Sequence, residues 1–261
     1  MYYIESNYFE TIKNIFKSYP DIQLLGFGYY SIVENNNFIT VSSDKIISEK
    51  FYIKNRDQLK KKLVKLWDDK MLYNIWNKVY LKSIIDKNNI KFYDENWGED
   101  MDFNRKYLSV ISNFYLSDEA FYNYVRERIG ASTNRYRENF YDIRRNEFIE
   151  FNNYFKKNGI EYSEYIEFSS RRFVECVLGV IENLFSSNLN FRSKYQKIKK
   201  ILNDKLLQTA LKNTNSKTLK TKIMLIPLKI KNVLLTMLMG KFVNVIKNKM
   251  PGLFNHLKNN R

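Results

Sequence analysis

The sequence predicts an α/β fold followed by a helical and strongly basic tail. Apolar, β-prone runs alternate with segments of helical periodicity in the first half, and the pattern is helical from residue 137 onward. The positive charge is concentrated in residues 191–261, which hold 17 Lys or Arg against a single acid, Asp204. This segment therefore accounts for the whole net charge of +16, and the rest of the chain is neutral.

Two segments near the N-terminus are predicted to pair as β-strands. Residues 22–33 form an apolar, β-prone run, and residues 38–41 return as its partner after a turn at 34–37. Gly26 and Gly28 are too few for a phosphate-binding loop. They indicate instead a close approach of backbones within the strand.

Helices are predicted where apolar residues recur at spacings of three and four. These segments are residues 6–18, 55–70, 82–87, 99–111, 138–157 and 164–186. Short extended pieces are expected at residues 90–92, 113–116 and 120–125. This order places an α/β domain at 1–135 and a helical region at 136–216.

The chain contains one histidine, His256, and one cysteine, Cys176. Ser-His and Cys-His catalysis, multi-histidine metal sites and a disulfide framework are therefore excluded. Acid–base chemistry must come from carboxylates, tyrosines or lysines. The longest strongly apolar run, residues 233–239, is far shorter than the ~20 residues of a membrane span.

The most informative stretch is residues 96–103, which ends a loop and opens an amphipathic helix. We expect Gly98 to end the loop, and Glu99 and Asp100 to occupy the first helical turn. Free N–H groups and the helix dipole stabilise negative charge there, so an ionised carboxylate could take a proton from a substrate hydroxyl. Acidic residues are also common in first turns because they suit the dipole, which leaves a purely structural role open.

Two arginines follow the last predicted strand. Arg126 and Arg128 precede a Gly-Ala-Ser loop and could hold a diphosphate, because a guanidinium offers forked donors. Pairing with Glu127 or Asp118 on the surface is the alternative, and the pattern leaves both open.

The tail, residues 217–261, begins with a lysine–threonine linker at 217–222. Residues 223–247 are apolar, flanked by lysines and interrupted by Pro227 and Gly240. An apolar segment with lysines, each attracted to anionic lipid by ~1 kcal/mol, predicts an anionic membrane surface as partner through residues 217–249. A helix docked on the domain is the alternative. Aromatic residues are too scarce in the tail for nucleic acid to be favoured as a partner.

The middle of the chain resembles the family 2 glycosyltransferases, bacterial inverting enzymes with a GT-A fold. Four ordered blocks carry the resemblance: Ile-Trp-Asn-Lys-Val-Tyr at 75–80, residues 86–92, Gly-Glu-Asp-Met-Asp-Phe-Asn at 98–104, and residues 122–132. The resemblance covers roughly residues 1–135. It implies the C-terminal, acceptor-side half of a GT-A (Rossmann-like) mixed sheet with flanking helices.

The family assigns roles to the matching residues. The resemblance implies that Asp100 is the general base, which deprotonates an acceptor sugar hydroxyl that attacks the anomeric carbon of a nucleotide-sugar with inversion. Glu99 would orient the acceptor or support Asp100. Further substrate contacts are implied for Trp76, Asn77, Lys78 and Trp97, and contacts to the leaving diphosphate for Arg126 and Arg128.

The chain departs from the family at its N-terminus. Family members begin with a nucleotide-binding half that ends in an Asp-x-Asp motif, which binds Mn²⁺ or Mg²⁺ through the donor phosphates. Residues 3–8 resemble the sequence directly after that motif, so we expect an N-terminally truncated enzyme without its own metal site, inactive alone.

The full-length form is expected to be a hexosyltransferase-type enzyme at the inner face of the cell membrane. Its donor would be a nucleotide-sugar, and its acceptor a polysaccharide or a lipid-linked sugar of the cell envelope. The alternative is a non-catalytic, membrane-associated or partner-binding remnant of such an enzyme.

Overall fold

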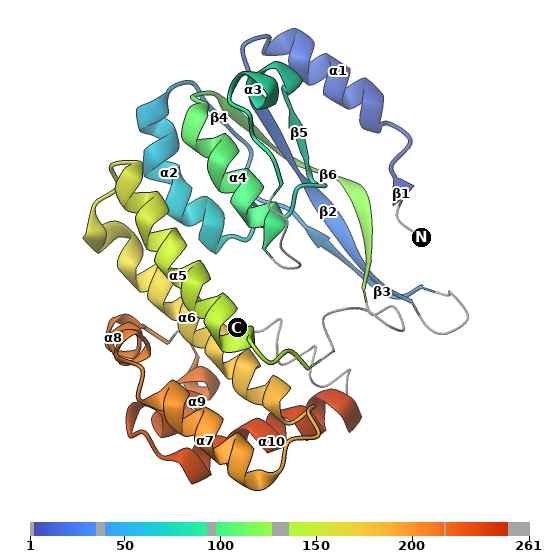
Figure 1. Cartoon of the computed structure of the whole chain (residues 1–261). Coiled ribbons are helices and arrows are strands. Elements are labelled where there is room, and N and C mark those ends of the chain that lie inside the picture. Colours follow the sequence, from blue (N-terminus) through green and yellow to red (C-terminus); the bar gives the residue numbers. More distant parts are fainter. Residues whose placement is uncertain (1–2, 35–39, 93–97, 127–135, 217, 250–261) are drawn as a thin grey trace. The chain divides into compact units, whose positions relative to one another are not determined.

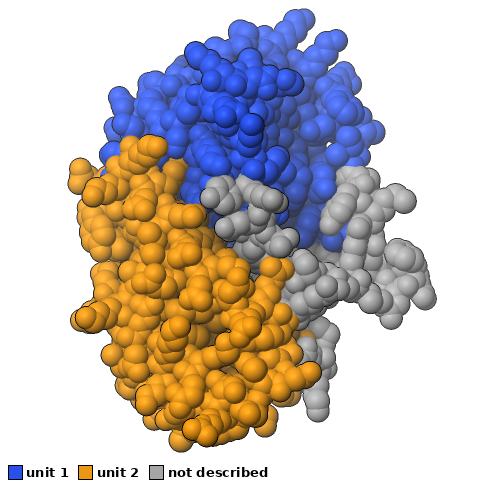
Figure 2. All heavy atoms as spheres, viewed as in Figure 1, with its two compact units in different colours: residues 1–131, 158–160 blue, residues 132–157, 161–261 orange. Residues whose placement is uncertain are grey.

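The computed structural model describes residues 3–34, 40–92, 98–126, 136–216 and 218–249 (Figure 1). The chain divides into two compact units, coloured separately in Figure 2. The first comprises residues 1–131 and 158–160, and the second residues 132–157 and 161–261. Each unit is described by itself.

The first unit contains a mixed sheet. Its described strands are β1 (Tyr3–Ile4), β2 (Leu24–Glu34), β3 (Thr40–Ile46), β4 (Phe51–Ile53), β5 (Lys78–Tyr80) and β6 (Phe114–Arg126). The long strands β2 and β6 run parallel side by side, from Leu24 opposite Phe114 to Val33 opposite Arg126. Strands β1 and β4 pair antiparallel with β6, and β3 and β5 pair antiparallel with β2.

The two glycines of β2 lie where neighbouring strands approach closely. A β-carbon at Gly28 would lie 2.5 Å from the Ile46 carbonyl oxygen, and one at Gly26 would lie 2.8 Å from Cδ1 of Leu116. The pairing register of β2 with β6 also shifts around these glycines. The sequence-based prediction of close backbone approach is therefore confirmed at Gly28, whereas side chains of β6 occupy the space beside Gly26.

The described helices of the first unit lie beside this sheet (Figure 1). They are α1 (Tyr8–Ser18), α2 (Arg56–Asp68), α3 (Lys82–Lys87) and α4 (Glu99–Val110). Helix α2 begins after Asn55, whose side chain accepts a hydrogen bond from the Gln58 N–H at 3.0 Å, and it buries Leu59, Leu63 and Leu66 as predicted. The predicted α/β class, a mixed sheet with flanking helices, is confirmed.

Some local predictions were wrong. The pieces expected at 113–116 and 120–125 are one continuous strand, β6, because both pair with β2. Residues 90–92 do not join the sheet. The N–H of Ile90 instead bonds to the carbonyl of Ile85 at 3.0 Å and closes the end of α3 after Asn89, whose φ is +48°.

The described part of the second unit is helical. Its helices are α5 (Phe140–Lys157), α6 (Tyr162–Leu184), α7 (Phe191–Leu202), α8 (Lys205–Asn213), α9 (Leu219–Lys229) and α10 (Val233–Lys249). Helix α6 supplies much of the core through Phe173, Val177 and Ile181, which belong to one buried apolar cluster with residues of α7 and α8. Both predicted helices of this region, 138–157 and 164–186, are confirmed.

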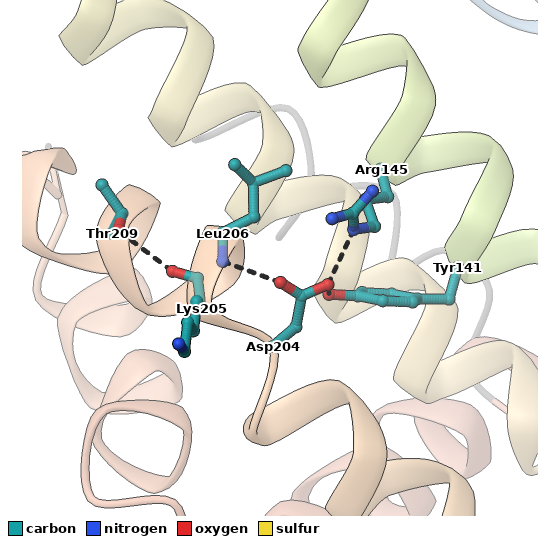
Figure 3. Close-up of polar contacts among 6 residues, drawn as sticks. All are labelled: Tyr141, Arg145, Asp204, Lys205, Leu206 and Thr209. Atoms are coloured by element: carbon teal, nitrogen blue, oxygen red, sulfur yellow. Dashed lines mark hydrogen bonds and ion pairs between the residues drawn. The ribbon is translucent and has the colours of Figure 1, made fainter.

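Asp204, the single acid of residues 191–261, is used structurally (Figure 3). It caps α8 by accepting a hydrogen bond from the Leu206 N–H at 2.7 Å. Its carboxylate also accepts bonds from the Tyr141 hydroxyl at 3.0 Å and from Nε of Arg145 at 2.8 Å. The turn between α7 and α8 is thereby fixed to α5.

The linker expected at 217–222 was wrong, because α9 begins at Leu219. The Thr218 hydroxyl caps the helix by accepting a bond from the Thr221 N–H at 3.2 Å. Pro227 and Gly240 lie inside α9 and α10, and the break falls between them at Lys231, whose φ is +52°. No described helix has the length and apolar composition needed to cross a lipid bilayer.

Candidate active site

Helix α4 begins where the sequence predicts. Gly98 precedes it with a φ of +89°, a left-handed conformation that glycine adopts without steric strain. Glu99 and Asp100 therefore stand in the first turn, beside backbone N–H groups that the helix does not use.

The Asp100 carboxylate lies beside the segment that contains β5. It accepts a hydrogen bond from the backbone N–H of Ile75 and interacts electrostatically with Lys78 and Tyr80. Asp100 is half-buried. The fold thus brings together two segments, 75–80 and 98–104, that are separate in the sequence.

Burial raises the pKa of Asp100, and the neighbouring Glu99 charge adds to the effect. The Ile75 N–H and the Lys78 ammonium act in the opposite direction without cancelling it. Loss of hydration thus outweighs the stabilisation by the Ile75 N–H and Lys78 at this carboxylate. A carboxylate of raised pKa is a stronger base in its ionised form.

Lys78 is an uncommon feature of this site because its side chain is buried. Its Nζ donates to the Asn74 carbonyl at 2.5 Å and to Oδ1 of Asn77 at 2.8 Å. Burial lowers the pKa of Lys78 to about 7, although the charge of Asp100 opposes that shift. The amine therefore changes protonation state near neutral pH.

Asn77 has a supporting position rather than an exposed one. Its side chain is fully buried, and Nδ2 donates to the Phe27 carbonyl of β2 at 3.3 Å. The Asn77 carbonyl in turn accepts a bond from the Phe27 N–H at 3.1 Å. Asn77 thus holds Lys78 and β2, and the substrate contact implied for it stays a prediction.

Trp76 belongs to a group of half-buried aromatic side chains. Its ring stacks on Tyr122 and Tyr124 of β6, with centroid distances of 4.5 and 5.1 Å and interplanar angles of 22° and 6°. The edge of Tyr29 from β2 meets it at 4.8 Å. The sequence-based site omitted these tyrosines, although residues two apart on a strand share one face.

Asn104 connects α4 to the loop that precedes Lys78. Its Oδ1 accepts a bond from the Tyr80 hydroxyl at 2.6 Å, and its Nδ2 donates to the carbonyls of Leu72 at 2.8 Å and Asn74 at 3.1 Å. Asn104 is thus a site residue that the sequence-based roles did not include.

The described residues do not fit a metal centre. Asp100 and Asp102 have Asp-x-Asp spacing, but residues two apart on a helix point to different sides. Asp102 pairs with Lys106 at 2.5 Å. No cluster of three His, Cys, Asp or Glu side chains occurs among the residues that the structure describes.

Several predicted site residues fall partly or wholly outside the description. Trp97 and Arg128 lie outside the described residues. Arg126 ends β6, and the structure describes its backbone position only. The diphosphate contact and the surface ion pair for these arginines both stay predictions.

Neither a known family profile nor a curated protein sequence matches the chain. Similar solved structures include the crystal structure of S. aureus TarS 1–349, with 14% identity and a TM-score of 0.48. The same protein in complex with UDP has 13% identity and a TM-score of 0.43. Each match covers 96% of this chain and 64% of the TarS chain, so this chain spans less than two thirds of that length.

Proposed function

We propose that this chain is the acceptor-side part of an inverting family 2 glycosyltransferase of the GT-A type. The reaction is hexose transfer from a nucleotide-sugar to a polysaccharide or lipid-linked acceptor. The proposal rests on one observation: Asp100, at the start of α4, receives the Ile75 N–H and lies near Lys78. Two of the four blocks of the sequence resemblance, residues 75–80 and 98–104, therefore converge on a single carboxylate.

In the proposed reaction, Asp100 removes the proton of an acceptor hydroxyl. The resulting oxygen nucleophile forms a bond to the anomeric carbon, and the bond from that carbon to the nucleoside diphosphate breaks. The raised pKa of Asp100 strengthens it as a base, while protonated Lys78 favours the ionised form that can accept the proton. Glu99, next to Asp100, is proposed to orient the acceptor.

The aromatic group around Trp76 is proposed to bind the acceptor ring. Trp76, Tyr122 and Tyr124 are half-buried, and their rings combine apolar faces with polar edges. Donor binding and any Mn²⁺ or Mg²⁺ would belong to the nucleotide-binding half of a full-length form. The described residues supply no step through a metal.

The test is sugar transfer from a panel of nucleotide-sugars, for this chain and for a form extended by in-frame upstream sequence. We expect transfer by the extended form and a loss of about 100-fold or more in kcat for Asp100→Asn, the range of general-base catalysis. Asp102→Asn is the matched control, since Asp102 lies on the same helix and pairs with Lys106. Wild-type turnover by Asp100→Asn would remove Asp100 from the mechanism.

A second outcome distinguishes the non-catalytic alternative. If neither form transfers sugar while this chain still binds acceptor saccharides, the chain is a binding remnant. Attachment to the inner face of the cell membrane is a separate proposal, because it depends on residues 217–249 and not on Asp100.

A further inference from the structure

Helix α10 is docked on α6 through one of its faces. A β-carbon at Gly240 would lie 2.7 Å from Cγ2 of Ile181 and 2.8 Å from Cε2 of Phe185, so the two helices approach closely there. One turn further on, Nδ2 of Asn244 donates to the Glu182 carboxylate at 2.8 Å. This face of α10 is therefore fixed within the second unit.

The opposite face of α10 is apolar and exposed. The exposed apolar residues recur at helical spacing and are Leu234, Leu235, Leu238, Phe242 and Val245. Helix α9, which contacts α10, repeats the arrangement: Leu225 and Leu228 are buried, while Leu219, Ile223, Ile226 and Ile230 are exposed. These nine side chains are between 41% and 73% exposed, and we call them the α9–α10 apolar rows.

Helices α9 and α10 therefore have apolar residues on a buried side and on an exposed side. A helix that is apolar on two sides has little contrast between its faces. Docking on the domain and binding to a membrane surface were alternatives at the level of sequence. Helix α10 has a docked face and, on its other side, an exposed apolar face. Exposed apolar rows of this kind mark an interaction surface.

Charge indicates what the surface binds. Lys222, Lys229, Lys231 and Lys241 are exposed on or between the same two helices. Residues 205–261 contain no aspartate or glutamate. The surface therefore combines apolar side chains with lysines, and its own segment of the sequence supplies no acid.

We propose that the α9–α10 apolar rows insert into the interface of an anionic lipid bilayer, with the lysines at the level of the headgroups. A bilayer of anionic lipid supplies both acyl chains and negative charge. A second copy of the chain would bring the same lysines and no acids to a symmetric interface, so like charges would meet. Single-stranded nucleic acid requires aromatic platforms, and only Phe242 among the exposed residues of these rows is aromatic.

The experiment is vesicle flotation of the full chain with phosphatidylcholine alone and with added phosphatidylglycerol. We expect binding that requires the anionic lipid and a loss of at least tenfold for Leu238→Ser/Phe242→Ser. Phe191→Ser on α7 is the matched control, because Phe191 and Phe242 are 64% and 65% exposed. It should bind like wild type.

Two sets of lysine variants distinguish the effect of lysines on this surface from the effect of net charge on lipid binding. Lys222→Gln/Lys229→Gln/Lys241→Gln should weaken binding strongly, whereas Lys61→Gln/Lys70→Gln/Lys91→Gln, with the same net charge, should not. Unchanged far-UV circular dichroism and melting temperature would show that the variants fold.

Three results would overturn the proposal. These are absence of flotation with anionic vesicles, wild-type binding by Leu238→Ser/Phe242→Ser, and dimerisation that the same variant abolishes without any lipid binding. None of these measurements uses sugar transfer, so failure here is distinguishable from failure of the proposed reaction.

Discussion

The hydroxyl of Tyr80 donates a 2.6 Å hydrogen bond to the side-chain oxygen of Asn104, and this bond joins strand β5 to helix α4. Because Asn104 also holds the carbonyls of Leu72 and Asn74, one buried amide positions the loop, the strand and the helix around Asp100. The candidate site is therefore held by a polar connection as well as by packing.

Asn104→Ala should destabilise the first unit by about 3 kcal/mol, because three bonds are lost. The Leu72 carbonyl and the Tyr80 hydroxyl lose the partner that Asn104 supplies, whereas the Asn74 carbonyl keeps Nζ of Lys78 as a donor. Tyr80→Phe removes one bond and should cost about 1 kcal/mol. Urea unfolding followed by tryptophan fluorescence measures both. Equal losses for the two variants would contradict the central position of Asn104.

Gly240→Ala should lower stability by about 1 kcal/mol, since steric strain against Ile181 and Phe185 exceeds the gain in helix propensity. Gly179→Ala is the matched control on α6. A β-carbon there meets nothing within 4 Å, so this change should raise stability by about 1 kcal/mol. Thermal unfolding measures the direction of the change in melting temperature for both variants. Stabilisation by both substitutions would contradict close packing at Gly240.

Glu147→Gln should destabilise the second unit by about 3 kcal/mol at neutral pH, because two half-buried arginines lose the buried carboxylate that pairs with them. Glu147 pairs with Arg144 at 2.6 Å and with Arg172. Burial alone would raise the pKa of Glu147, but these arginines outweigh it and hold the pKa below its usual value.

The stabilisation that Glu147 provides should decrease as the pH falls. Because the folded pKa of Glu147 lies below the unfolded value of about 4.3, ionised Glu147 stabilises the fold fully above that pH. This stabilisation is lost as the pH falls through the folded pKa. The difference between wild type and Glu147→Gln should shrink accordingly in urea unfolding at decreasing pH. Glu138→Gln, which breaks an exposed pair with Lys197 at 3.4 Å, should change stability by less than about 0.5 kcal/mol.

The stability of the wild type should rise with pH relative to Lys78→Met. Since burial lowers the pKa of Lys78 to about 7, the unfolded chain binds a proton that the folded chain lacks. The rise in stability should occur between the folded pKa and the unfolded pKa of about 10.4. Unfolding free energies of both proteins across this range provide the measurement, and parallel pH profiles would show that Lys78 keeps an ordinary pKa.

Local periodicity predicted many of the helices and the long strand β2. Helix α3 was predicted at its observed bounds, and the start of α4 followed from a glycine before two acids. Strand β5 was missed because it has three residues, too few for a period. Its conformation depends on pairing with residues 24–26, far away in the chain.

The sequence by itself determined which chemistry this protein can use and where its charge lies. With one histidine and one cysteine, acid–base catalysis must use carboxylates, tyrosines or lysines. Counting the charged residues shows that the positive charge lies in residues 191–261. Only the tertiary structure decided that Ile75 and Lys78 surround Asp100, and that α10 has one apolar face docked and one exposed. The physical reason is that burial and pKa depend on contacts between segments distant along the chain, which the spacing of neighbouring residues does not encode.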